Sequence, residues 1–158
     1  MLIKHITNNY KQTQKIGESL AKTIMKNGLQ KKAVVLALYG NLGGGKTTFL
    51  QGFAKGLNIK EKILSPTFVI QKKFKIPNPK SKTNSKSKIQ NIELFYHFDC
   101  YRLNNPAEIL ELDFKSIIKN PENIIAIEWP EKIKKLLPRD VIKIDFTFIN
   151  KNKREIKF

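Results

Sequence analysis

The stretch YGNLGGGKTTFL, residues Tyr39 to Leu50, decides the fold class. Four residues separate Gly40 from Gly45, and Lys46 and Thr47 follow directly. The apolar run AVVLAL precedes this stretch, and a segment with helical apolar spacing follows it. Such spacing between a strand and a helix is the phosphate-binding P-loop pattern. It predicts an α/β fold whose glycine loop binds the phosphates of a nucleotide.

Each residue type in this loop has a chemical role. Glycines permit backbone conformations with positive φ, so that successive N–H groups can point into one concavity around an anion. The same anion faces the positive end of the following helix. Lys46 would contact the outer phosphates, and the Thr47 hydroxyl would bind Mg²⁺. A glycine-rich turn with a solvated lysine is the alternative. The loop residues expected to bind the nucleotide are Asn41, Leu42, Gly43, Gly44, Gly45, Lys46, Thr47 and Thr48.

Length and composition indicate one globular domain over residues 1–158, with 41% hydrophobic residues. The longest apolar or aromatic run, Ala33 to Tyr39, is too short to span a bilayer, and the amino terminus is too polar for a secretory signal. We therefore expect a cytoplasmic protein without a membrane partner. A single cysteine, Cys100, excludes an internal disulfide and a cysteine-based zinc site, and we expect it to serve packing.

Charge alone leaves the partner open. The chain has 30 basic and 13 acidic residues, a net charge of +17 that suggests a nucleic-acid partner. Lysines dominate the basic set, as an AT-rich coding sequence would also impose. A lysine-rich segment at about 76–88 predicts a mobile surface insertion, which is either a solvated hairpin loop or an RNA-binding arm.

Apolar periodicity predicts a mixed sheet with flanking helices. Ile16, Leu20 and Ile24 recur at helical spacing within Asn9 to Asn27, and Gly28 is placed to end that helix. Strands that directly follow one another predict an antiparallel portion of the sheet. The other predicted elements are strands within 33–39, 69–75, 92–99, 123–129, 141–149 and 154–158, a helix after the P-loop, and short helices at 106–112 and 130–137.

Two predicted strands end in an acid, ELFYHFD in Asp99 and IIAIE in Glu128. Ligands of open α/β sheets bind at the carboxyl ends of the strands, so these carboxylates are candidates to hold the metal or its water. Each acid could instead face solvent, and the pattern does not say which would be the direct ligand. We interpret the neighbouring His97 as structural.

The motifs GNLGGGKTTF, SPTF, HFDCYRL and EWPE, in that order, resemble the signature of the bacterial TsaE (YjeE) family over about Val35 to Ile144. That family consists of small P-loop α/β ATPases that assist threonylcarbamoyladenosine (t6A) synthesis on tRNA. The resemblance implies ATP and Mg²⁺ as cofactors. It also implies two partners, the threonylcarbamoyl transferase (TsaD) and its paralogue (TsaB), whose complex is reset by ATP turnover, and a contact with tRNA through that complex.

The resemblance also implies residue roles. Lys46 and Thr47 match the nucleotide and Mg²⁺ residues, and Ser65 and Thr67 match a switch-like loop near the γ-phosphate. Asp99 and Glu128 match two acids important for hydrolysis. Trp129 matches a residue beside the nucleotide, although an indole at a strand end is also a common core anchor. Two features depart from the family, the longer lysine-rich insertion and a glycine at position 44, where alanine is common.

Three other functions compete with this hypothesis. A GTPase normally needs an Asn-Lys-x-Asp element, and the similar string Asn150-Lys151-Asn152-Lys153 lacks the acid. A small-molecule kinase usually has an arginine-rich lid, whereas the three arginines here, Arg102, Arg139 and Arg154, are scattered. An RNA-binding module regulated by ATP would fit the lysine-rich segment, but that segment has no interleaved aromatic residues.

Overall fold

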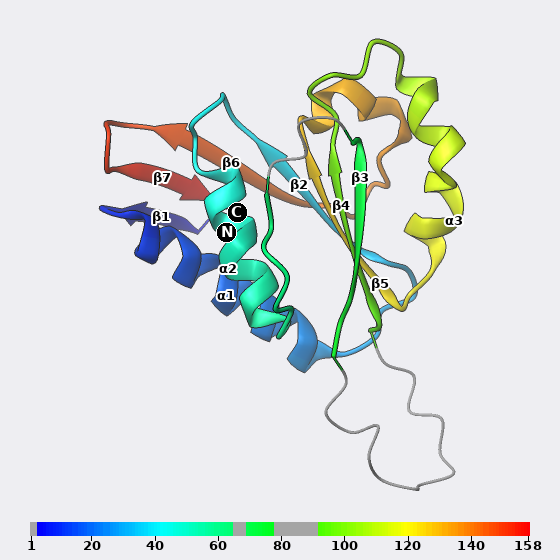
Figure 1. Cartoon of the computed structure of the whole chain (residues 1–158), viewed down its shortest axis with the longest axis horizontal. Coiled ribbons are helices and arrows are strands. Elements are labelled where there is room, and N and C mark those ends of the chain that lie inside the picture. Colours follow the sequence, from blue (N-terminus) through cyan, green and yellow to red (C-terminus); the bar gives the residue numbers. More distant parts are fainter. Residues whose placement is uncertain (1–2, 65–68, 78–91) are drawn as a thin grey trace, which may run out of the picture.

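A seven-stranded mixed sheet forms the centre of the computed structural model, which describes residues 3–64, 69–77 and 92–158 (Figure 1). The strand order is β1-β7-β6-β2-β5-β4-β3. Strands β6, β2, β5 and β4 are parallel to their neighbours in this set, and the pairs β1–β7, β7–β6 and β3–β4 are antiparallel. The predicted mixed sheet is thus confirmed. The strands are β1 (Lys4–Thr7), β2 (Val34–Tyr39), β3 (Gln71–Lys75), β4 (Leu94–Asp99), β5 (Asn123–Glu128), β6 (Ile142–Phe148) and β7 (Arg154–Lys157).

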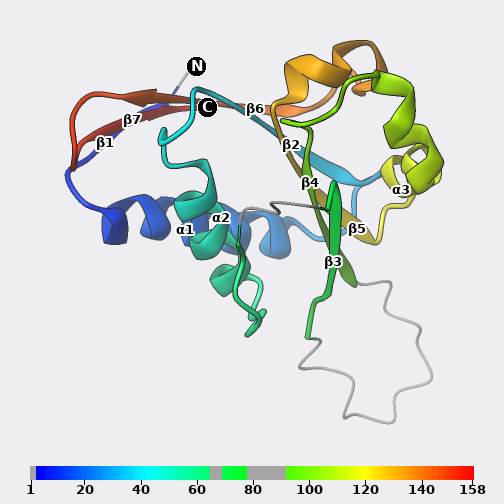
Figure 2. The ribbon, with the colours of Figure 1, turned by 45° about the horizontal axis from the view of Figure 1, so that its top comes forward.

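Helices cover both faces of the sheet (Figure 2). On one face lie α1 (Tyr10–Asn27) and α2 (Lys46–Gly56), and on the other lie α3 (Phe114–Lys119) and the 3₁₀ helices η2 (Pro106–Leu112) and η3 (Pro130–Leu136). The central strands are therefore buried on both sides, which explains why β2 and β5 are almost wholly apolar.

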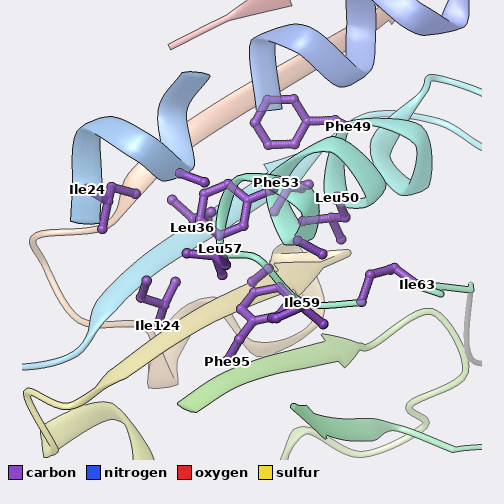
Figure 3. Close-up of a cluster of buried hydrophobic side chains, with 14 of the residues drawn as sticks. Ile24, Leu36, Phe49, Leu50, Phe53, Leu57, Ile59, Ile63, Phe95 and Ile124 are labelled. Carbon is purple, nitrogen blue, oxygen red and sulfur yellow. The ribbon is translucent and has the colours of Figure 1, made fainter. Parts of the chain in front are cut away.

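The larger core lies between α1, α2 and the sheet (Figure 3). Phe49 and Phe53 are spaced one helical turn apart on α2, and both are fully buried. Phe53 packs against Phe95 of β4, with ring centroids 5.6 Å apart. This apolar contact fixes α2 against the sheet, with the P-loop at the start of the helix near the carboxyl ends of the parallel strands.

Most of the predicted helices and strands are confirmed, and the differences concern the type of the two short helices, strand β1 and helix α3. Helix α1 begins after Asn9, whose side chain accepts a hydrogen bond from the Gln12 N–H, and ends at Gly28 with φ of 71°. The two predicted short helices after Asn105 and Trp129 are 3₁₀ helices that start with proline. Strand β1 and helix α3 were not predicted. The predicted insertion at about 76–88 lies outside the described residues from position 78 onward.

Glycines allow α1 and α2 to approach each other closely. A Cβ added at Gly52 would lie 1.9 Å from the backbone oxygen of Gln14, and a Cβ at Gly17 would lie 2.2 Å from that of Phe49. Neither backbone oxygen can move without separating the two helices. The helix pair therefore depends on these glycines.

We expect Gly52→Ala to lower the free energy of unfolding by about 3 kcal/mol, because the methyl group forces the helices apart. The measurement is urea denaturation followed by circular dichroism. Ser19→Ala, an exposed change on α1, is the control and should shift the value by less than about 0.5 kcal/mol. Equal unfolding midpoints for Gly52→Ala and the parent protein would contradict this description of the helix contact.

Candidate nucleotide-binding site

The loop between β2 and α2 has the backbone geometry of a phosphate cradle. Gly40, Gly43 and Gly45 have φ of 134°, 73° and 100°, values that residues with a Cβ rarely adopt. Gly45 is the N-cap of α2, and no side chain caps this helix end. The N–H groups at the start of α2 therefore remain available to an anion, as the P-loop pattern predicts.

Lys46, the first residue of α2, is folded back over its own loop. Its Nζ donates hydrogen bonds to the backbone oxygens of Gly40 (2.5 Å) and Asn41 (3.0 Å), and it lies 4.6 Å from the centre of the Trp129 ring. Burial lowers the pKa of Lys46, while Glu128 and Asp99 act in the opposite direction. These contacts are with neutral groups, which phosphate oxygens can replace with stronger charge-assisted hydrogen bonds.

The two predicted acids lie side by side. Strands β4 and β5 are parallel, and Asp99 is paired with Glu128 in their register. Both residues line the same pocket as Lys46 and Thr47. Glu128 is 3% exposed, and its Oε1 lies 2.9 Å from Nε2 of the buried His97. Asp99 Oδ1 accepts a hydrogen bond from the Tyr101 N–H at 3.0 Å. The expectation that these acids share the carboxyl edge of the sheet is confirmed.

Trp129 follows Glu128 in a left-handed backbone conformation, with φ of 57° and ψ of 49°. Such values are unusual for a bulky residue and tend to occur at functional sites. Its ring lies 5.0 Å from that of Tyr101 and also packs against the core that contains Ile133. The indole thus serves both as a core anchor and as part of the pocket wall.

One pocket of about 520 Å³ joins these groups, a volume in the range of small-molecule sites. Asn41 is absent from the described residues that line it, and contributes instead the carbonyl that holds Lys46. Ser65 and Thr67 lie outside the described residues. The lining residues are Asn9, Tyr10, Thr13, Leu42, Gly43, Gly44, Gly45, Lys46, Thr47, Thr48, Asp99, Tyr101, Glu128, Trp129, Lys151, Asn152 and Arg154.

Part of this wall was not predicted from the sequence. Asn9 and Tyr10 come from the start of α1, and Arg154 comes from the start of β7. The Nε of Arg154 donates to the backbone oxygen of Gly43 at 3.0 Å, which joins the P-loop to the β6–β7 hairpin. No motif spacing connects residues that are 111 positions apart, so this contact depends on the strand order alone.

The described side chains of the pocket fit Mg²⁺ when a phosphate group completes the coordination shell of the ion. Within residues 3–64, 69–77 and 92–158, no group of three or more His, Cys, Asp or Glu side chains could hold a metal ion. The pocket does provide the Asp99 and Glu128 carboxylates and the Thr47 hydroxyl, which are all oxygen ligands. Mg²⁺ commonly binds one or two carboxylates and completes its shell with water and substrate phosphates.

Cys100 follows Asp99 directly but belongs to the core. Its side chain is fully buried, which confirms its predicted packing role. Burial, assisted by Asp99, raises the pKa of this thiol to about 12. The thiol therefore stays neutral in the folded chain. Burial of the neutral thiol contributes fully to the free energy of unfolding below the pKa of the unfolded thiol. This contribution is lost as the pH rises from that value towards 12, because the thiol then ionises in the unfolded chain and not in the folded one.

We expect iodoacetamide to leave Cys100 unmodified in the folded protein at pH 8, because the thiolate is the nucleophile. The same reagent should modify it fully in 8 M urea, and mass spectrometry counts the adducts. Equal rates of modification in the two conditions would contradict the burial of this residue.

None of the helices in the described part of the chain is long and apolar enough to cross a membrane.

The family model for the threonylcarbamoyl adenosine biosynthesis protein TsaE matches residues 7–156. The tRNA threonylcarbamoyladenosine biosynthesis protein TsaE of Rickettsia felis is 34% identical over 152 residues, which cover 94% of this chain and 75% of the relative. The protein of the same description from Bacillus subtilis is 31% identical over 156 residues, 99% of this chain and 84% of the relative. The crystal structure of Bacillus subtilis YdiB superposes with a TM-score of 0.68 at 27% identity, and the match covers 100% of this chain and 84% of that chain.

Proposed function

The chain belongs to the TsaE family, and on this premise we propose that it is a Mg²⁺-dependent ATPase that supports t6A modification of tRNA. The observation that carries this proposal is the meeting of Lys46, Asp99 and Glu128 in one pocket at the start of α2. A buried cation, free helix N–H groups and two carboxylates are the parts that phosphoryl transfer from a nucleotide requires.

Each group has a proposed part in this activity. The P-loop N–H groups and Lys46 bind the phosphate oxygens and stabilise the charge that develops on them. The Thr47 hydroxyl and the carboxylates of Asp99 and Glu128 would hold Mg²⁺, which when bound neutralises phosphate charge. We propose that Glu128 also orients the attacking water. Trp129 forms the wall of the pocket beside Lys46.

We further propose that hydrolysis is weak in the isolated chain and rises in a complex with the threonylcarbamoyl transferase (TsaD) and its paralogue (TsaB). The pocket rim supports this proposal, because Leu42, Tyr10 and Tyr101 line it and are 67%, 61% and 45% exposed. Apolar and aromatic side chains grouped at the mouth of a site are typical of a surface that another protein covers. A cytoplasmic location follows from this role on tRNA, and any contact with tRNA would occur through the complex.

The proposal is tested by reconstituted tRNA modification with both partners, in which the transferase is limiting. We expect many t6A products per transferase when the chain is present, and about one per transferase when it is omitted or carries Lys46→Ala. Equal accumulation with and without the chain would refute the role in resetting the complex.

A further inference from the structure

His97 is a buried polar residue for which the P-loop and metal roles above have no use. It lies on β4 two positions before Asp99, and its side chain is fully buried. Because side chains alternate along a strand, His97 and Asp99 share a face with Phe95, which packs in the core beneath α2. The imidazole therefore lies on the face of the sheet that the P-loop covers.

The hydrogen bond of His97 goes to Glu128. Its Nε2 lies 2.9 Å from Glu128 Oε1, and the two side chains are 0% and 4% exposed. An ionised carboxylate can only accept hydrogen bonds, so in the His97 tautomer that fits this contact Nε2 carries the hydrogen and donates it to Glu128. In the register of β4 and β5, His97 lies opposite Ala126. Its side chain therefore reaches diagonally to Glu128, two residues further along β5.

The other ring nitrogen limits what His97 can do. Nδ1 is buried and has no hydrogen-bond partner within the described part of the chain. A proton on Nδ1 would need an acceptor there, so the tautomer with hydrogen on Nε2 fits this site. An unpaired buried nitrogen also costs stability. Packing alone therefore does not explain an imidazole where an apolar side chain of similar size would fit.

This contact determines which oxygen of Glu128 faces a ligand. Oε1 is held by a fully buried donor, and no hydrogen bond within the described residues reaches Oε2. Because Glu128 lines the pocket, we infer that Oε2 is the oxygen left to contact a metal or a water molecule there.

We propose that His97 is a positioning residue for ATP hydrolysis, whose Nε2–H holds the Glu128 carboxylate with Oε2 presented to the pocket. This inference rests on the proposed ATPase function. His97 contacts no substrate in this account and transfers no proton, so its substitution should affect turnover and leave ATP affinity intact.

Two substitutions separate the hydrogen bond from the packing. His97→Phe fills the space without a donor, whereas His97→Gln places an amide Nε2 donor the same number of bonds from Cα. With both partners present, we expect His97→Phe to lower kcat roughly tenfold to a hundredfold, as loss of an orienting partner commonly does. KM and calorimetric affinity for ATP should change less than about twofold. His97→Gln should recover most of kcat.

Thermal denaturation shows whether both variants fold. If the two folded variants have equal kcat values, whether normal or reduced, the positioning role is refuted. A rise in KM that accounts for the whole loss of kcat/KM would also overturn it, because that result indicates a role in ATP binding.

A combined substitution tests whether His97 acts through Glu128. Once Glu128→Gln has removed the carboxylate, adding His97→Phe should lower kcat by less than about twofold further. Losses that multiply independently would show that His97 acts by another route, and would overturn the proposal.

Nuclear magnetic resonance tests the contact without reference to activity. The chain has two histidines, so the ring signals of His97 can be assigned by comparison with His97→Phe. We expect a slowly exchanging, low-field Nε2–H proton that shifts in Glu128→Gln, and its absence would overturn the hydrogen bond. If the parent protein hydrolyses no ATP with its partners, the proposed function fails. If it hydrolyses ATP and His97→Phe is unimpaired, only the positioning role fails.

Discussion

Replacing Lys46 with alanine is expected to weaken ATP binding at least about a hundredfold and to remove detectable hydrolysis. Removing one partner from a buried charge contact commonly costs that much, because the other charge is left uncompensated. Lys46 is 5% exposed, and its ammonium group faces neutral carbonyls and the Trp129 ring in the free chain. Isothermal titration calorimetry measures the affinity, and phosphate release measures the turnover.

Lys55 provides the matched control, because it lies in the last turn of the same helix. Its side chain is 75% exposed and contacts Glu18 at 3.2 Å, far along α2 from the P-loop. Lys55→Ala should therefore bind ATP as tightly as the parent protein. If Lys46→Ala retains affinity within about threefold of the Lys55→Ala value, the assignment of the P-loop pocket to phosphate is wrong.

Replacing Glu128 with alanine is expected to spare ATP binding and to lower kcat by about a hundredfold to a thousandfold, the usual cost of losing a group that acts in the transition state. The residue lies at the end of β5 beside Asp99 and is 3% exposed. Phosphate release in the presence of both partners gives kcat, and calorimetry gives the ATP affinity.

Two further variants show whether this loss is chemical. Glu128→Gln keeps an oxygen that can accept from His97, so it should fold normally and still lose turnover. Glu131→Ala removes an exposed carboxylate in the next segment and should leave kcat unchanged. Undiminished hydrolysis by Glu128→Ala would refute its assignment.

The P-loop and the two acids were predictable because local patterns determine them. Glycine spacing specifies positive φ, which Gly43 and Gly45 indeed show. The positions of Asp99 and Glu128 followed from a general rule, since acids that end two parallel strands meet at one edge of the sheet. Their pairing in register confirms that rule for this chain.

Contacts that depend on how strands distant in the sequence align with each other were not predictable from the sequence. The hydrogen-bonding contact between His97 and Glu128 joins residues 31 positions apart, and its diagonal geometry depends on how β4 and β5 align. The sequence alone favours a structural role for His97, because a lone histidine is more often structural than catalytic. The left-handed backbone of Trp129 is likewise set by its surroundings, since a tryptophan has no intrinsic preference for that conformation.

The edge of the sheet formed by β1 was not predictable, whereas the opposite edge strand β3 was. Strand β1 has four residues, of which Thr7 alone is fully buried, so the segment shows little apolar alternation. Its pairing with β7 brings the start of α1 beside the P-loop, and this is how Tyr10 reaches the pocket.

The proposed function requires that this pocket hydrolyses ATP within a partner complex. The most direct test is steady-state phosphate release by the purified chain, alone and with the transferase, its paralogue or both, over a range of salt concentrations. We expect weak turnover by the isolated chain, a large rise that requires both partners, and loss of that rise in Lys46→Ala. Turnover that the partners leave unchanged, or that persists in Lys46→Ala, would contradict the proposed function.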